Sequence, residues 1–103
     1  MNDIVSDLLR EGITWIRSIV VTLGPICEIR FQMASSPTGP HEASVTFTNV
    51  ADLRIEGLGS PLAWNLSVVD VSERGLENVN WAITDPPMGR LAFTAATIES
   101  ART

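Results

Sequence analysis

Apolar residues occupy every second position along most of this chain. The clearest alternation covers residues 27–33, where the apolar positions are Cys27, Ile29, Phe31 and Met33. Successive side chains of a strand point to opposite faces, so this period predicts a strand with one buried face. The same pattern returns in residues 44–48, 52–56, 64–68, 78–83 and 90–95, and Ile98 is expected to extend the last of these strands.

The first residues follow a different period. In residues 2–11 the apolar positions recur at helical spacing, namely Ile4, Val5, Leu8 and Leu9. Asn2 or Asp3 can cap the start of a helix and Gly12 can end it, so we predict a short amphipathic helix. Residues 13–23 fit either a continued helical stripe or a strand, and their β-branched content favours a strand.

Turn-forming residues separate these elements. Residues 35–42 hold two prolines and a glycine and are expected to form an exposed loop, which is also the best candidate for disorder. Further turns are predicted at residues 49–51, 57–61, 72–75 and 85–89.

These elements predict a mainly β (α+β) fold: an antiparallel sheet of six or seven strands, curled or barrel-like, with one N-terminal helix. A chain of 103 residues fits a single domain, residues 1–103, whose small core would gain from dimerisation. The core is predicted to contain the in-phase residues Phe31, Phe47, Leu53, Ile55, Leu66 and Phe93.

Charge and cysteine content narrow the function. The formal net charge is −5, which argues against binding a nucleic-acid backbone or an anionic membrane and favours a basic protein partner. Cys27 is the only cysteine, so no internal disulfide is available and a cytoplasmic location is expected. The acidic N-terminus lacks the pattern of a signal peptide, and residues 13–26 are too short and too interrupted to span a bilayer.

The sequence offers little catalytic chemistry. His41 is the only histidine, and neither a nucleophile with its orienting acid nor a set of zinc ligands is visible around it. Cys27 stands in the apolar register of its strand, where it is expected to serve as a small buried residue. We therefore expect no enzyme activity, no metal and no cofactor.

Two groups of carboxylates are the candidate binding residues. Asp3, Asp7 and Glu11 share one edge of the predicted helix, and Asp70, Glu73 and Glu77 surround a predicted turn. Either group fits an ordinary solvated surface or a surface that meets arginine and lysine side chains.

The tryptophans admit two interpretations. Trp64 and Trp81 are in phase with the apolar faces of their strands and are expected in the core, whereas an exposed Trp15 would mark an interface. If the sheet instead closes over a cavity, all three would line a pocket for a small molecule.

The order and spacing of several strands resemble a known class of proteins. The residues that carry the resemblance are Val45 to Val50, Leu53 to Ile55, Leu66 to Val68, Trp81 to Ile83, Gly89 to Phe93 and Ile98. Residues 44–99 thereby resemble small β-rich immunity-type proteins of bacterial toxin and immunity loci. The resemblance implies binding of a cognate toxin without catalytic residues, and it leaves out the predicted helix and first strand.

The expected function is therefore that of a non-enzymatic, cytoplasmic immunity protein that neutralises a basic toxin domain by masking its surface. The alternative is a small-molecule-binding or structural homo-oligomeric β domain.

Overall fold

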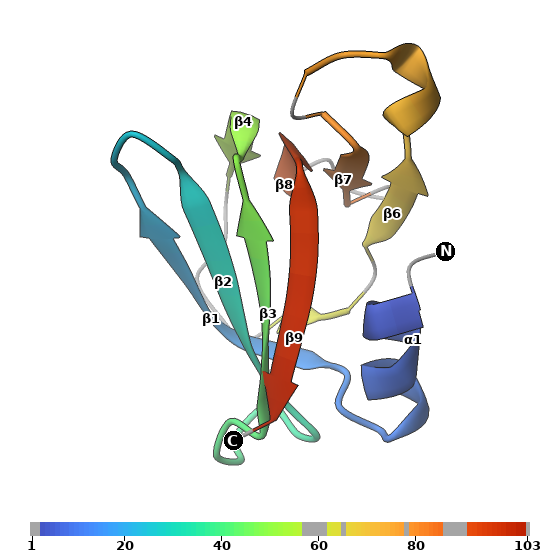
Figure 1. Cartoon of the computed structure of the whole chain (residues 1–103). Helices are drawn as coiled ribbons and strands as arrows, with labels where there is room; N and C mark the ends of the chain where they lie inside the picture. The colour runs from blue at the N-terminus through green and yellow to red at the C-terminus, as the bar shows by residue number, and fades with distance from the viewer. Residues whose placement is uncertain (1–2, 57–61, 65, 78, 86–90, 103) are drawn as a thin grey trace.

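The computed structural model describes residues 3–56, 62–64, 66–77, 79–85 and 91–102 (Figure 1). One helix, α1 (Asp3–Arg10), precedes the strands. The strands are β1 (Trp15–Thr22), β2 (Glu28–Ala34), β3 (Ala43–Thr48), β4 (Ala51–Ile55), β5 (Leu62–Ala63), β6 (Ser67–Asp70), β7 (Trp81–Thr84), β8 (Leu91–Ala95) and β9 (Thr97–Arg102). The predicted helix and the strand interpretation of residues 13–23 are both confirmed.

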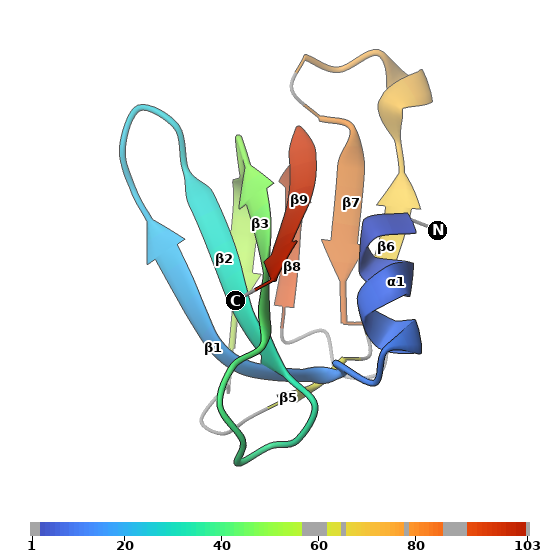
Figure 2. The same cartoon turned by 60° about the horizontal axis from the view of Figure 1, so that its bottom comes forward.

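The described strands form two antiparallel sheets. One has the order β5-β1-β2-β3-β9 and the other the order β4-β8-β7-β6. The prediction of an antiparallel, mainly β fold with an N-terminal helix is thus confirmed. The single curled or barrel-like sheet is wrong, and the described residues form nine strands instead of six or seven. The sheets form two layers that remain open at their edges, because the chain passes from one layer to the other instead of closing one sheet (Figures 1 and 2).

Two of the connections between the sheets, β3–β4 and β8–β9, lie side by side. Strand β3 pairs with β9 and β4 pairs with β8, so a two-stranded ribbon bends from one sheet into the other. At the bend the Ala96 N–H donates to the Thr48 carbonyl at 2.9 Å, and the Asn80 side-chain amide donates to the Ala96 carbonyl at 3.0 Å. Ile98 therefore does not extend β8, as the alternation predicted. It lies in β9, in the other layer.

Two residues near the bend have unusual backbone angles, one in the β3–β4 connection and one at the register shift within β4. Asn49 and Asp52 have positive φ angles of 52° and 55°. Asparagine and aspartate tolerate this left-handed region better than other residues with a side chain. Residues 49–51 therefore connect two layers rather than two paired strands.

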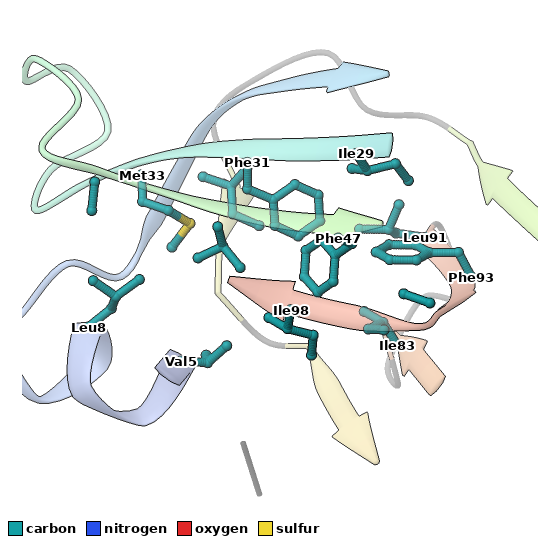
Figure 3. Packing of buried hydrophobic residues seen from close by; sticks show 14 of the residues in the cluster. Val5, Leu8, Ile29, Phe31, Met33, Phe47, Ile83, Leu91, Phe93 and Ile98 are labelled. Atoms are coloured by element: carbon teal, nitrogen blue, oxygen red, sulfur yellow. The ribbon is translucent and has the colours of Figure 1, made fainter. Parts of the chain in front are cut away.

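The core lies between the two layers and is centred on aromatic rings (Figure 3). Phe31 of β2 contacts Phe47 of β3 and Phe93 of β8, with ring centroids 5.1 and 6.2 Å apart. Phe47 and Phe93 are 5.0 Å apart, so the rings join both sheets. These three phenylalanines are core residues as predicted, and Leu66 packs at the margin of the cluster.

Two predicted core residues are not buried. Leu53 and Ile55 are 37% and 39% exposed. Ile55 lies directly opposite the fully buried Leu91, so its side chain is on the inner face of the sheet, as its phase predicted. However, β4 is an edge strand, and the tip of the β1–β2 hairpin stands apart from it (Figures 1 and 2). The exposure of Ile55 therefore goes with its place at the edge of the sheet and not with an incorrect phase.

Helix α1 lies beside the core at the edge opposite to β4 (Figure 1). Val5 and the fully buried Leu8 point from the helix into the cluster (Figure 3). The helix ends where predicted: Gly12 has a φ of 83°, and the Ile13 N–H donates to the Leu8 carbonyl at 3.0 Å. The turn then leads directly into β1.

The predicted loop at residues 35–42 connects β2 and β3 and is closed by Glu42. Its carboxylate accepts the Ser35 backbone N–H at 2.7 Å, and hydrogen bonding from the side chain and then the backbone of Ser35 lowers the pKa of Glu42. The Arg17 guanidinium donates to the Gly39 carbonyl and so connects the loop to β1. The predicted turn at residues 57–61 and residues 86–89 of the last turn lie outside the described residues.

The strand predicted at residues 64–68 is only partly formed. Trp64 precedes β6 and donates its backbone N–H to the Thr14 carbonyl at 2.7 Å, while its ring contacts Phe31. The chain therefore uses Trp64 to cross from one layer to the other, and β6 begins only at Ser67.

Candidate binding surface

Two carboxylates, one in α1 and one directly after it, are paired with arginines. Asp7 Oδ1 lies 2.7 Å from Arg10 Nη2, and Glu11 Oε2 lies 2.5 Å from Arg102 Nη2 of β9. Both pairs are solvent-exposed, so each contributes little to stability. They nevertheless offset the negative charge of the helix surface. The side chain of Asp3 lies outside the described part of the chain.

The second predicted group lies on the connection between β6 and β7. This connection starts with a 3-10 turn at Ser72–Arg74, which Gly75 ends with a φ of 70°. Asp70 accepts hydrogen bonds from the Ser72 backbone N–H at 2.9 Å and from the Ser72 hydroxyl at 2.6 Å. These bonds favour the ionised carboxylate and lower the pKa of Asp70. Asp70 is thus held charged in a fixed position.

Glu73 and Glu77 are exposed on the same connection. Neither forms an ion pair with any residue that the structure describes. Together with Asp70 they give residues 70–77 three carboxylates, while the same residues contain one guanidinium, that of the exposed Arg74. We call Asp70, Glu73 and Glu77 the acidic turn.

Apolar side chains lie close to the acidic turn along the chain. Val69 precedes Asp70 and Leu76 precedes Glu77, and both are half or more exposed. In Figure 1 the connection projects beyond the ends of β6 and β7. A projecting segment that combines charge with exposed apolar side chains is suited to contact another protein.

The structure does not bring the two acidic groups together. The acidic turn stands at the far end of β6, whereas the end of α1 that carries Glu11 lies at the opposite end of the molecule (Figures 1 and 2). Asp7 and Glu11 also have arginine partners, and within the described ranges Glu73 and Glu77 have none. The acidic turn is therefore the stronger candidate for attracting a basic partner.

The three tryptophans lie on different elements. Trp15 is half-buried in β1, opposite Ala34, and does not belong to the core cluster. Trp64 and Trp81 are half-buried and pack against that cluster from the two layers, close to the prediction that they belong to the core. Among the three, the structure gives a ring contact only for Trp64.

Cys27 and His41 lie at opposite ends of β2. Cys27 is half-buried against the core just before the strand, and His41 is exposed in the loop that follows it. The strand rises about 3.3 Å per residue and so separates them by roughly 20 Å. A nucleophile and its base need a hydrogen-bond distance, so these two residues do not form such a pair.

Within the described ranges, no three His, Cys, Asp or Glu side chains are arranged to hold a metal ion. In the same part of the chain, no helix has the length and apolar character needed to cross a membrane.

Replacing Cys27 or His41 with alanine is expected to leave partner binding unchanged. Cys27 packs as a small apolar side chain, and His41 lies in the loop, far from the acidic turn. Circular dichroism checks that each variant folds, and the association rate with the partner checks function. A folded variant that no longer binds would contradict this prediction and reopen the question of catalysis.

Sequence reasoning missed one surface feature. Four exposed apolar side chains gather in the β1–β2 hairpin, namely Val20, Val21, Leu23 and Ile26. The consecutive valines were visible in the sequence, but the pattern did not show that both faces of this hairpin remain exposed.

No family model matches this chain, and the comparisons with curated proteins and with solved structures also find no match.

Proposed function

We propose that this chain is a non-enzymatic binding protein that neutralises a basic partner by covering its surface, in the manner of an immunity protein against a bacterial toxin domain. The observation that carries the proposal is the exposed acidic turn, whose Glu73 and Glu77 lack ion-pair partners among the described residues. The resemblance of residues 44–99 to immunity-type proteins supplies the class of partner.

The electrostatic argument follows from the chemistry of such partners. Toxins that act on nucleic acids need a basic cleft for the phosphate backbone. Carboxylates that stay ionised at neutral pH are attracted to the same cleft and raise the rate of encounter. The lowered pKa of Asp70 keeps its charge present well below neutral pH.

The apolar side chains give the turn a second role after encounter. Charge steers association over several ångströms, but exposed ion pairs add little to the final affinity. Val69 and Leu76 precede Asp70 and Glu77 along the chain, and both are exposed, so they supply apolar area that a complex can bury. We therefore infer that the acidic turn raises the association rate and that burial of Val69 and Leu76 slows dissociation of the partner.

The test compares two variants that each remove two negative charges. The first is the double substitution Glu73→Gln and Glu77→Gln, which leaves the Asp70–Ser72 hydrogen bonds intact. The matched control is Asp7→Asn with Glu11→Gln, which removes carboxylates that are paired with Arg10 and Arg102. The probe is the purified product of the neighbouring gene.

The turn variant is expected to associate several-fold more slowly at low salt, and the helix control is expected to change less. At 1 M salt the difference should vanish, because the Debye length falls from about 8 Å at 0.15 M to about 3 Å. Stopped-flow association rates measure both effects. Equal rates for wild type and both variants at all salt concentrations would overturn the role of the turn.

Toxin neutralisation is tested separately in cells. Co-expression of this chain with the neighbouring gene product is expected to restore growth that the product alone prevents. A neighbouring product without toxicity, or toxicity that this chain does not relieve, would overturn the immunity proposal.

A further inference from the structure

The five-stranded sheet has an outer face that points away from the core. Phe31, Val45 and Ile98 are buried in the core, so the alternate positions of β2, β3 and β9 form this outer face. Three rows cross the face from β2 through β3 to β9, namely Glu28–Thr48–Thr97, Arg30–Thr46–Glu99 and Gln32–Ser44–Ala101. Arg30 and Glu99 are exposed, so the middle row is accessible to another molecule.

The middle row carries one positive and one negative side chain. Arg30 and Glu99 lie on the two sides of Thr46, and two strand spacings separate them by roughly 10 Å. Neither forms an ion pair with any residue that the structure describes. Three other exposed arginines are ion-paired within the chain, namely Arg10, Arg54 and Arg102. The two opposite charges are thus symmetric about Thr46 and available to a partner.

The centre of the face can pair with its own copy. Strand β3 contributes three hydroxyls to the face, those of Ser44, Thr46 and Thr48. A hydroxyl both donates and accepts hydrogen bonds, so two identical hydroxyls can bond to each other. The short side chains of β3 also allow a second sheet to approach closely. These hydroxyls therefore do not require a chemically different partner.

We propose that two copies of this chain associate through their outer faces, about a two-fold axis that runs parallel to β3 and passes over Thr46. Strands β2 and β9 flank β3 at equal spacing, so this axis sets β2 of each copy over β9 of the other. Arg30 of each copy then faces Glu99 of the other copy. An axis across the strands would instead set each of these charges against its own counterpart, so the charges select the axis parallel to β3.

The other contacts in this arrangement are compatible with it. Glu28 of each copy faces Thr97 of the other, whose hydroxyl can donate to the carboxylate. Two sheets that pack face to face keep their strand directions within about 30°, which an axis along the strands allows. The face is small and polar, so we expect a weak dimer whose specificity comes from the paired charges.

The dimer leaves the acidic turn free. This turn connects β6 and β7 of the four-stranded sheet and is not part of the outer face of the five-stranded sheet. The inference therefore goes beyond the proposed function and does not depend on it.

Charge reversal tests the arrangement. Arg30→Glu would set two carboxylates against each other at both ends of the middle row, and Glu99→Arg would do the same with two guanidinium groups. The double variant, Arg30→Glu with Glu99→Arg, restores opposite charges in exchanged positions. The matched control is Arg74→Glu, which changes the net charge as Arg30→Glu does but lies on the exposed connection between β6 and β7.

Sedimentation equilibrium of the full chain at concentrations up to about 1 mM is expected to show a reversible dimer. Each single reversal should raise the dimer dissociation constant by about tenfold or more, because like charges at an interface oppose association. The double variant should return close to the wild-type constant, and Arg74→Glu should leave it unchanged. Circular dichroism checks that every variant is folded.

Several outcomes would overturn the proposal. These are a monomeric wild type, single variants that dimerise like the wild type, and a folded double variant that stays as weak as the single variants. An equal loss in Arg74→Glu would also overturn it, because net charge and not the outer face would then decide association. All of these measurements use the chain alone, so their outcome is separate from binding of the neighbouring gene product.

Discussion

Replacing Phe47 with alanine is expected to lower the free energy of unfolding by about 3–5 kcal/mol. Phe47 is fully buried, and its ring lies 5.1 Å from that of Phe31 and 5.0 Å from that of Phe93. Alanine would remove contacts on both sides of the layer boundary and leave a cavity where the two sheets meet. A loss of this size consumes much of the stability of a small domain.

Urea denaturation measures the effect through the midpoint of unfolding. Leu53→Ala is the matched control, since alternation predicted both residues in the core but the structure leaves Leu53 exposed at an edge. The control should lose clearly less stability than Phe47→Ala. An unchanged midpoint for Phe47→Ala, or an equal loss for both, would contradict the packing described above.

Periodicity predicted the elements because each strand buries one face. It correctly assigned the inner faces of β2, β3 and β8, and it separated the helical spacing of α1 from the strands. It did not predict the two layers, because alternation shows which side chains share a face and not which strands are neighbours. The bend at Thr48 and Ala96 depends on hydrogen bonds between residues far apart in sequence.

Burial also depends on more than phase. Ile55 has the correct phase but lies on the edge strand β4, where it stays 39% exposed. Val20 is exposed for another reason, since it lies opposite the exposed Arg30, on the outer face of its sheet. A single sequence contains no direct signal for the position of a strand within its sheet.

The sequence identified the candidate binding residues as two groups of carboxylates, but it did not show which of these carboxylates have arginine partners. Arg10 is three residues from Asp7, so this pair was within reach of helix spacing rules. Arg102 meets Glu11 only because β9 ends beside α1, which is a consequence of tertiary structure. The structure thus separates two acidic groups that appeared equivalent in the sequence, and it favours the acidic turn.

Replacing Leu8 with alanine is expected to lower the free energy of unfolding by about 2–5 kcal/mol. Leu8 is fully buried and attaches α1 to the core (Figure 3). An eight-residue helix is too short to persist in water by its own hydrogen bonds, so its stability depends on this packing. Loss of the contact should therefore also speed amide exchange throughout α1.

Leu9→Ala provides the control for the Leu8 prediction, because it makes the same substitution at the next position of the same helix. Leu9 is only partly buried, so its truncation should cost less than that of Leu8. Alanine has a higher intrinsic helix propensity than leucine, so neither loss can arise from propensity. Urea midpoints and exchange rates in α1 decide the outcome. Equal losses for the two variants, with equal exchange, would show that Leu8 does not hold the helix against the sheets.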